Sequence, residues 1–287
     1  MAESGVRAET YRSVVAAWEC DVMGHLTIAY YFDRFTDAAF TLIERLNPGM
    51  PPAAAWRTSE VLVRYQRELR AGDGMVATSG IIGGEGEDLA IGHELVEAAS
   101  GEVATLVEHR LAPRTLPYGG SGEMRRALVA AATPWSSPGF EPLPEPAPGA
   151  RVIDSGRDRV KTAEVDERGE LLLSGYVHRF AHACLFVCGA FGMTSAYMRE
   201  QRRGFSTFET RLHLVATPPG AGDGVAVTSR LLAAGKSSLR LRHELRRAKG
   251  GELLAVFHQS GVHFDLEARR SAPLPPALRE AAQALLG

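Results

Sequence analysis

The stretch ECDVMGHLTIAYYFDRFTDA, residues 19–38, decides the fold because the chain carries a second version of it. Residues 164–183 read EVDERGELLLSGYVHRFAHA, at an offset of 145. The matching positions are Glu19 and Glu164, Asp21 and Asp166, Gly24 and Gly169, Tyr31 and Tyr176, Arg34 and Arg179, and Phe35 and Phe180. A repeat of this kind predicts two copies of one structural unit.

The repeat continues downstream at an offset of 150. AGDGMVATS at residues 71–79 matches AGDGVAVTS at residues 221–229, and the tripeptide HEL recurs at 93–95 and 243–245. Between the copies the chain is dense in proline, which is typical of an extended connector. We therefore predict an N-terminal unit at residues 1–132, a linker at residues 133–152 and a C-terminal unit at residues 153–287.

Each copy predicts a long amphipathic helix followed by antiparallel strands. Apolar residues recur at spacings of three and four, as on one face of a helix. They are Tyr31, Phe35, Ala38, Leu42 and Leu46 in the first copy, and Tyr176, Phe180, Ala183, Val187 and Phe191 in the second. Later residues such as Leu239, Leu241 and His243 alternate with charged residues, which indicates a half-buried strand. The expected fold class is α+β, twice over, each unit a helix wrapped by an antiparallel sheet.

Composition excludes several classes of partner. The net charge of −2 gives no general basic field for nucleic acid or anionic lipid, so neither is an expected partner. The longest apolar stretch, residues 183–193, is about half the length of a membrane-spanning helix. No leader-like segment opens the sequence, so we expect a cytoplasmic protein. Cys184 and Cys188 lie in that apolar stretch and are expected to be reduced core residues.

Two stretches carry a resemblance to a known family. WECDVMGH, residues 18–25, precedes a helix with Tyr and Phe four positions apart, and RELRAGD, residues 67–73, reads as a strand end. This pattern resembles the hotdog-fold acyl-CoA thioesterases of the 4-hydroxybenzoyl-CoA thioesterase type. The resemblance implies two tandem hotdog units, each a curved antiparallel sheet around a long central helix. It also implies hydrolysis of a small-molecule acyl thioester with no metal or other cofactor, coenzyme A being part of the substrate.

The resemblance assigns roles to residues around the loop. Thioester hydrolysis needs a carboxylate that activates water or attacks directly, and by resemblance that is Asp21. Backbone N–H groups around Gly24, His25 and Leu26, close to the helix N-terminus, are the expected donors to the carbonyl oxygen. The side chain of His25 is expected to orient the carboxylate or contact the acyl group. The expected substrate-binding residues are Leu26, Thr27, Tyr30 and Tyr31.

The second copy departs from the pattern. It keeps Asp166 and Gly169 but has Glu170 in place of the histidine. These three residues are second-copy candidates, and the first copy is the better candidate for chemistry because it is nearer the motif. In the first copy Thr27 stands where relatives often have asparagine, which leaves substrate orientation by that side chain open.

Each assignment has a structural alternative. Asp21 can brace a turn or cap the helix, and Tyr31 can be a core residue. His178 and His182 have the spacing of a metal pair, but no third ligand is evident, so no metal site is expected. The arginine-rich run at residues 240–249 is a solvated strand face or a landing site for coenzyme A phosphates.

Two other function classes stay open. One is a hydratase or dehydratase acting on acyl thioesters, which the same fold supports; the other is a non-catalytic module that binds an acyl thioester. Release of free thiol from a saturated acyl-CoA separates hydrolysis from both. Pairing of chains through open sheet edges predicts a homo-oligomer.

Overall fold

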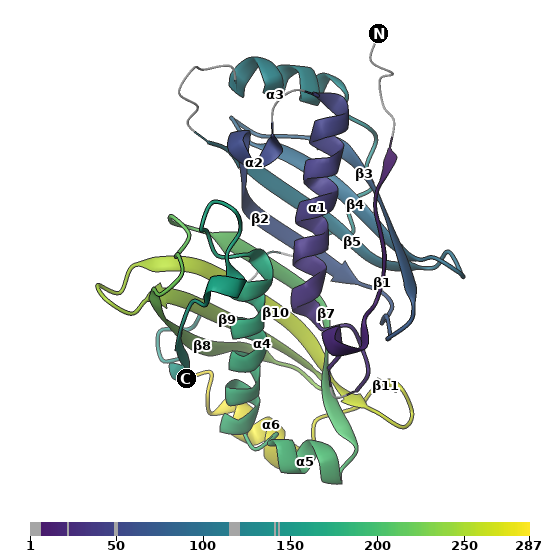
Figure 1. Cartoon of the computed structure of the whole chain (residues 1–287). Coiled ribbons are helices and arrows are strands. Elements are labelled where there is room, and N and C mark those ends of the chain that lie inside the picture. Colours follow the sequence, from purple (N-terminus) through teal and green to yellow (C-terminus); the bar gives the residue numbers. More distant parts are fainter. Residues whose placement is uncertain (1–6, 22, 49–50, 115–120, 141, 143) are drawn as a thin grey trace. The chain divides into compact units, whose positions relative to one another are not determined.

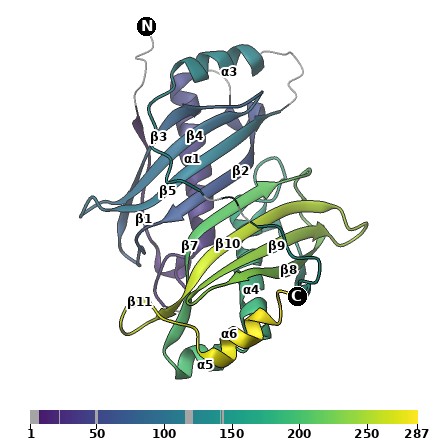
Figure 2. The same ribbon diagram turned by 180° about the vertical axis from the view of Figure 1, so that it is seen from behind.

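The computed structural model describes residues 7–21, 23–48, 51–114, 121–140, 142 and 144–287. It divides the chain into two compact units, Met1–Phe140 and Glu141–Gly287. Each unit consists of a long helix lying on one face of an antiparallel sheet, as the front and back views show (Figures 1 and 2). The predicted α+β class with two tandem units is therefore confirmed. The predicted ends of the linker, residues 133 and 152, stay a prediction.

In the described residues of the N-terminal unit there are five strands, in the sheet order β1-β3-β4-β5-β2. Its elements are β1 (Ala8–Val14), the 3-10 helix η1 (Ala17–Glu19), α1 (Ile28–Leu46), α2 (Pro52–Ala55), β2 (Trp56–Tyr65), β3 (Gly74–Gly83), β4 (Leu89–Glu97), β5 (Val103–Pro113) and α3 (Ser121–Ala130). Every strand pair within this order is antiparallel.

The C-terminal unit repeats this order as β6-β8-β9-β10-β7, with a short β11 paired to β10. Its elements are β6 (Ile153–Arg159), the 3-10 helix η2 (Thr162–Glu164), α4 (Leu173–Ala190), α5 (Ser195–Glu200), β7 (Arg203–Leu214), β8 (Gly224–Ala234), β9 (Ser238–Arg247), β10 (Leu253–Asp265), β11 (Arg270–Ser271) and α6 (Pro276–Gln283).

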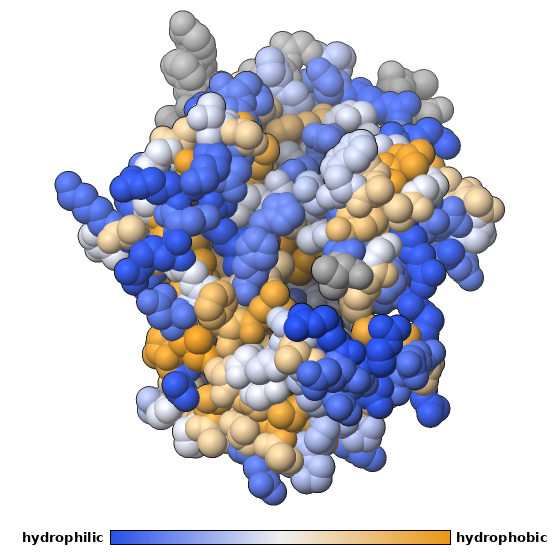
Figure 3. All heavy atoms as spheres, turned by 60° about the horizontal axis from the view of Figure 1, so that its bottom comes forward, coloured by the Kyte–Doolittle hydropathy of each residue, from blue (hydrophilic) through white to orange (hydrophobic). Residues whose placement is uncertain are grey.

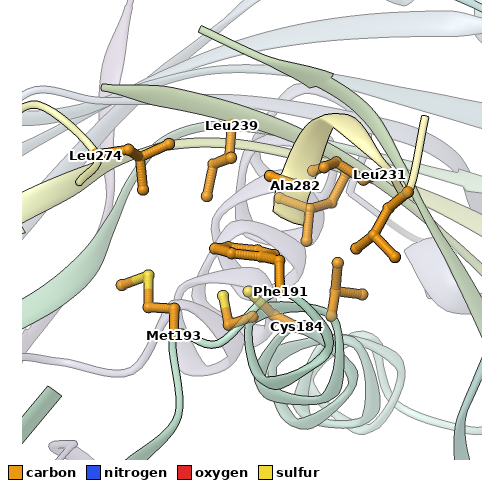
Figure 4. Close-up of a cluster of buried hydrophobic side chains, with 11 residues drawn as sticks. Cys184, Phe191, Met193, Leu231, Leu239, Leu274 and Ala282 are labelled. Carbon is orange, nitrogen blue, oxygen red and sulfur yellow. The ribbon is translucent and has the colours of Figure 1, made fainter. Parts of the chain in front are cut away.

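The two long helices bury the apolar stripes that the sequence predicted. Tyr31, Phe35, Ala38 and Leu42 of α1 are buried, while Leu46 at the helix end is 39% exposed. Around the end of α4, apolar residues from the sheet and the C-terminal segment close the core (Figure 4). They include Phe191, Met193, Leu231, Leu239, Leu274 and Ala282. Full burial of each large side chain contributes roughly 1.5–3 kcal/mol, so these stripes fix each helix on its sheet.

A row of buried polar side chains crosses each sheet beneath its helix, with one residue on each strand. In the N-terminal unit this polar row is Thr10, Ser79, His93, His109 and Thr58, in sheet order. The Oγ of Ser79 lies 2.6 Å from Thr10 Oγ1 and 2.7 Å from His93 Nδ1, and Thr58 Oγ1 lies 2.8 Å from His109 Nε2. The row therefore links strands that are distant in sequence.

The C-terminal unit has a second polar row at the equivalent positions, namely the buried Ser155, Ser229, His243 and Gln259 and the half-buried Thr207. Ser229 Oγ lies 2.6 Å from both Ser155 Oγ and His243 Nδ1, and the Gln259 amide donates to Thr207 Oγ1 at 2.7 Å. Phe35 stacks on His93 and Phe180 stacks on His243, with ring centroids 6.0 Å apart in each case. The repeated HEL tripeptide thus marks a buried histidine in each unit.

Two sequence expectations concern membranes and metals. None of the helices in the described ranges has the length and apolar character needed to cross a membrane. Within the same ranges, no three side chains of His, Cys, Asp or Glu gather as a metal site would need.

Candidate active-site loop

The loop between η1 and α1 is a closed turn in the N-terminal unit. Cys20 and Leu26 form an isolated antiparallel bridge, and the backbone N–H of Asp21 donates to the His25 carbonyl at 2.8 Å. Gly24 has a φ of +76°, in the left-handed region that favours glycine. A Cβ at Gly24 would meet nothing within 4 Å, so the backbone conformation requires glycine there and the surrounding space does not.

Asp21 braces this turn with one carboxylate oxygen. Its Oδ1 accepts hydrogen bonds from the backbone N–H groups of Met23 at 2.8 Å and His25 at 3.1 Å. The carboxylate is exposed, and within the described part of the chain no hydrogen bond to Oδ2 is formed. The same side chain therefore shapes the loop with one oxygen and presents the other to solvent.

The C-terminal unit builds the same turn. Asp166 Oδ1 accepts from the backbone N–H groups of Arg168 and Glu170, both at 2.9 Å, and Gly169 has a φ of +77°. The repeated aspartate and glycine are therefore explained by the turn in both units. A catalytic role in one unit has to rest on what differs between the two loops.

The loop is tied to its helix by a buried ion pair in each unit. Arg34 of α1 donates to both carboxylate oxygens of Glu19 at 2.7 Å, and Arg179 of α4 donates to Glu164 at 2.9 and 3.0 Å. Glu19 Oε2 also accepts the backbone N–H of Ala16 at 2.9 Å. The two pairs lie at equivalent positions of the repeat, where the sequence alone assigned them no role. Each pair holds the start of its loop against the helix.

The stretch RELRAGD, which was predicted to be a strand end, forms the connection between β2 and β3. It lies beside this loop, so the two stretches that carry the family resemblance come together. The backbone N–H of Leu26 donates to the Leu69 carbonyl at 2.7 Å, and His25 bridges to Arg70. The Nε2 of His25 lies 3.2 Å from Glu68 Oε2, an ion-pair distance at which the angle falls short of a hydrogen bond. The side chain of His25 is only 8% exposed, so it faces Glu68 more than solvent.

The pair of His25 and Glu68 is absent from the C-terminal unit. Leu171 donates to the Pro219 carbonyl at 3.0 Å, which repeats the backbone contact of Leu26. The positions of the pair, however, are occupied by Glu170 and Pro218. Both members have been replaced although the backbone is the same, so the two loops differ in side-chain chemistry.

The predicted oxyanion donors already have partners in this conformation. The N–H groups of Gly24, His25 and Leu26 bond to Asp21 or Leu69. At the start of α1, the cap residue Thr27 makes no side-chain cap bond, and its N–H donates to Glu19.

The next two N–H groups, those of Ile28 and Ala29, find no acceptor among the residues that the structure describes. They belong to the first turn of α1, where backbone donors and the helix dipole favour negative charge. Sequence reasoning missed them because the loop's own hydrogen bonds are not visible in the sequence.

The predicted substrate-binding residues differ in exposure. Leu26 is buried, whereas Thr27 and Tyr30 are half-buried. Tyr31 is 2% exposed and packs edge-on against Tyr65 with ring centroids 5.4 Å apart. Burial raises the pKa of the Tyr31 phenol, and its ring belongs to the core of the unit.

Trp18 is a feature of this loop to which sequence reasoning gave no role. Its side chain is 82% exposed although it lies in η1, directly before the anchored Glu19. On the face shown in Figure 3, hydrophobic residues lie in patches among hydrophilic ones. The equivalent residue of the C-terminal unit is Ala163, so the exposed indole is specific to the loop that also has His25 and Glu68.

Comparisons with known proteins identify the architecture. No curated protein matches the chain. Among solved structures, a putative oleoyl thioesterase from Lactobacillus plantarum aligns with a TM-score of 0.67 at 10% identity, covering 95% of this chain and 99% of the other. An acyl-ACP thioesterase from Bacteroides thetaiotaomicron aligns with a TM-score of 0.64 at 11% identity, covering 88% and 96%. The 12:0-ACP thioesterase from Umbellularia californica aligns with a TM-score of 0.63 at 13% identity, covering 88% and 93%.

These likenesses concern the fold, and they agree with two tandem hotdog units. The model of the thioesterase-like superfamily matches residues 15–117 and 160–282, one match in each unit. The predicted resemblance is thereby confirmed over most of the chain: this protein is a member of the thioesterase-like superfamily.

Proposed function

We propose that the chain hydrolyses an acyl thioester at the loop of its N-terminal unit, with Asp21 as the reacting carboxylate. The observation that carries this proposal is the difference between two loops that share the same bracing hydrogen bonds and the same glycine conformation. Both have the bracing aspartate and glycine, but only the N-terminal loop adds the pair of His25 and Glu68 and the exposed Trp18. Membership of the superfamily supports the reaction class.

The chemistry follows from the two ends of the loop. The free Oδ2 of Asp21 takes a proton from water, and the resulting hydroxide attacks the thioester carbonyl carbon. The N–H groups of Ile28 and Ala29 meet the charge that develops on the carbonyl oxygen. The C–S bond then breaks, and the proton held by Asp21 passes to the leaving sulfur, so that the free thiol departs and the Asp21 carboxylate is restored. Direct attack by Asp21 is the alternative route; it forms a mixed anhydride with the acyl group and expels the thiolate. Labelled water that opens this anhydride at the Asp21 carbon would leave ¹⁸O in the Asp21 carboxylate after a single turnover.

The side chain of His25 acts on the loop and not on the substrate in this proposal. It is 8% exposed, and its Nε2 faces Glu68, while its backbone N–H donates to Asp21. The pair therefore joins the connection between β2 and β3 to His25, whose backbone N–H holds the Asp21 carboxylate. His25 and Glu68 are positioning residues for Asp21.

Trp18 supplies the rim of the proposed site. An indole that is 82% exposed leaves a large apolar face in water, and such a surface commonly marks a contact with a ligand or partner. Because Glu19 is fixed by Arg34, the backbone beside Trp18 is held in place. We assign Trp18 to contact with the acyl thioester, together with the half-buried Tyr30 and Thr27.

We assign the C-terminal loop a structural role and no catalytic role. Asp166 and Gly169 maintain its turn, and Glu170 stands where the positioning histidine would be. The substrate is a small-molecule acyl thioester of coenzyme A or of a carrier, and no cofactor is required. The homo-oligomer and the cytoplasmic location stay predictions.

A thiol-release assay tests the proposed reaction. The protein is mixed with short, branched, aromatic and long acyl-CoAs and with acyl-pantetheine thioesters, and free thiol is followed with a disulfide reagent. We expect steady release from at least one member of the panel. Binding without thiol release would favour the non-catalytic module, and water addition to an unsaturated acyl-CoA without thiol release would favour a hydratase.

A further inference from the structure

The outer face of each sheet, opposite its long helix, carries a second set of equivalent positions. In the N-terminal unit these are Gly80, Gly92 and Glu108, on neighbouring strands in register. The linker residue Trp135 lies directly on Gly92, since a Cβ there would come within 2.7 Å of the indole, and Thr133 and Arg7 cover Gly80. The indole N–H donates to Glu108 Oε1 at 3.1 Å, and Arg7 lies over the ring at 5.2 Å. The indole ring of Trp135 therefore covers the outer face of the sheet at Gly92 and Glu108.

The C-terminal unit replaces the two glycines with arginines. Arg230 of β8 is opposite Arg242 of β9, Arg242 is opposite His258 of β10, and His258 is opposite Arg211 of β7. Three arginines and one histidine thus form one line across the sheet, which we call the basic row. Arg242 is 17% exposed and Arg230 is 28% exposed, so both are partly desolvated.

A pocket lies over Arg230 and Arg242, the half of the basic row that is equivalent to the glycines beneath Trp135 in the other unit. Its volume is about 360 Å³, within the usual range for small-molecule sites. Arg230, Arg242 and Glu244 line one side, and the linker supplies Pro146, Pro148 and Val152 among other apolar residues. The pocket therefore combines a charged floor with an apolar wall.

On the sheet side, the pocket is lined by two arginines and one carboxylate, Arg230, Arg242 and Glu244. Glu244 accepts from Arg242 Nε at 3.1 Å and from Arg246 at 2.8 Å, and it lies 3.7 Å from Arg230. One carboxylate, 11% exposed, thus faces three guanidinium groups. Burial, together with the charges of Arg242 and Arg211, lowers the pKa of His258 to about 4. Because His258 is neutral, the positive charge of the basic row is carried by its arginines.

The linker already presents an anion to this floor. Arg242 Nη1 donates to Glu145 Oε2 at 3.0 Å, although the Glu145 side chain is 84% exposed. An exposed ion pair of this kind is weak, commonly below about 1 kcal/mol. A stronger anion can therefore displace the Glu145 carboxylate without disturbing the fold.

We propose that this pocket is a binding site for a small molecule that carries a phosphate group. The phosphate binds Arg230 and Arg242 in place of Glu145, because the guanidinium fork matches phosphate oxygens. The remainder of the molecule lies against Pro146 and Val152. The site belongs to the C-terminal unit and is separate from the Asp21 loop, so it does not depend on the proposed hydrolysis. The phosphorylated end of coenzyme A and a free phosphate metabolite are two sources of the same chemistry.

Calorimetric titration of the full chain tests the proposal. The probes are adenosine 3′,5′-bisphosphate, inorganic phosphate and unphosphorylated pantetheine. We expect the bisphosphate to bind, pantetheine not to bind, and the affinity to fall as salt rises. Tighter binding of the bisphosphate than of inorganic phosphate would favour the coenzyme A end, and equal binding would favour a free phosphate. Absence of binding by both phosphate probes would overturn the proposal.

Matched variants locate the binding. Arg242→Gln and Arg230→Gln should each weaken bisphosphate binding about tenfold or more, the loss of one charge-assisted contact. Glu145→Ala should strengthen it severalfold, because the competing carboxylate is gone. Arg157→Gln, which removes an arginine 72% exposed on β6, should leave it unchanged. Equal weakening by Arg157→Gln, or no response to Glu145→Ala, would contradict a site at this pocket.

Folding of the arginine variants is checked by thermal melting, and the exposed Glu145→Ala carries the test if either arginine variant fails to fold. Thiol release by Glu145→Ala is measured in parallel. Unchanged release with altered bisphosphate binding would show that the pocket and the Asp21 loop are independent. Loss of binding affinity on Glu145→Ala would mean that Glu145 supports the ligand, which is contrary to the proposal.

Discussion

Arg34 and Arg179 hold equivalent glutamates in the two units, but their surroundings differ. Arg34 donates to Glu19, and its Nε has no hydrogen-bond partner within the described residues. Arg179 donates to Glu164 and also to Asp158, with its Nε 3.0 Å from Asp158 Oδ1. If the glutamate were removed from each unit, Arg179 would still have the Asp158 carboxylate beside it, whereas Arg34 would lose the carboxylate to which it donates.

This difference predicts unequal costs for one substitution. Glu19→Gln should lower the free energy of unfolding by about 3 kcal/mol, because it leaves Arg34 buried and unpaired. Glu164→Gln should cost less than half as much, since Asp158 remains. Urea unfolding measures both, and hydrogen exchange of α1 and α4 amides locates the loss. Equal losses would mean that the extra carboxylate contributes nothing.

Substitution of the two loop glycines, Gly24 and Gly169, distinguishes an effect on stability from an effect on thiol release. Gly24→Ala and Gly169→Ala should each cost about 1 kcal/mol, because an L residue is strained at positive φ and no neighbour obstructs the new Cβ. Gly122→Ala, in α3 with open space around it and no positive φ, should cost nothing. Thiol release should fall only in Gly24→Ala. A similar fall in Gly169→Ala would place chemistry in both loops.

The buried histidines predict sensitivity to acid. Burial lowers the pKa of His109 to about 4, of His243 to about 3, and of His93 well below its ordinary value. As the pH falls below about 6.5, the unfolded chain binds protons that the folded chain does not. Stability is therefore fully present above pH 6.5 and is lost as the pH falls towards 4, by up to about 1.4 kcal/mol per pH unit for each histidine.

The second polar row supplies the variant that tests this. Gln259 occupies the position equivalent to His109, so His109→Gln should fit the same place. We expect the variant to lose stability between pH 6.5 and 4.5 with a slope smaller by one proton than that of the wild type. Urea unfolding across this range measures the slopes. Identical slopes would show that His109 does not titrate on unfolding.

Trp18 should affect substrate binding more than stability. Trp18→Ala is expected to raise KM severalfold with little change in kcat, and to leave the unfolding free energy within about 0.5 kcal/mol because the side chain is exposed. Trp18→Phe should recover part of the affinity. Ala163→Trp, the matched change in the other unit, should change neither constant. A KM unchanged in Trp18→Ala would exclude contact between Trp18 and substrate.

The sequence predicted much of the fold because repetition made its pattern visible. The stripes of α1 and α4 and the alternation in β9 follow from local spacing, and they are buried as expected. The polar rows could not be predicted, because whether His93 is buried depends on strands distant in sequence. The HEL repeat indicated only that the position matters.

The candidate site was predictable only in outline. Asp21 and Gly24 were found by motif, but their hydrogen bonds show a turn that recurs at Asp166. The partner of His25 is Glu68, forty-three positions away, and no periodic pattern connects them. The donors at Ile28 and Ala29 could not be predicted, because the sequence does not show which N–H groups the loop itself pairs.

Thiol release by Asp21→Asn and Asp166→Asn tests the central claim most directly. The amide oxygen of asparagine can still accept the two backbone N–H groups that brace each turn, so both variants should keep the fold. We predict that Asp21→Asn loses turnover by roughly a hundredfold or more, while Asp166→Asn stays within about twofold of the wild type. Equal losses in the two variants, or full activity in Asp21→Asn, would contradict the assignment of the chemistry to the N-terminal loop.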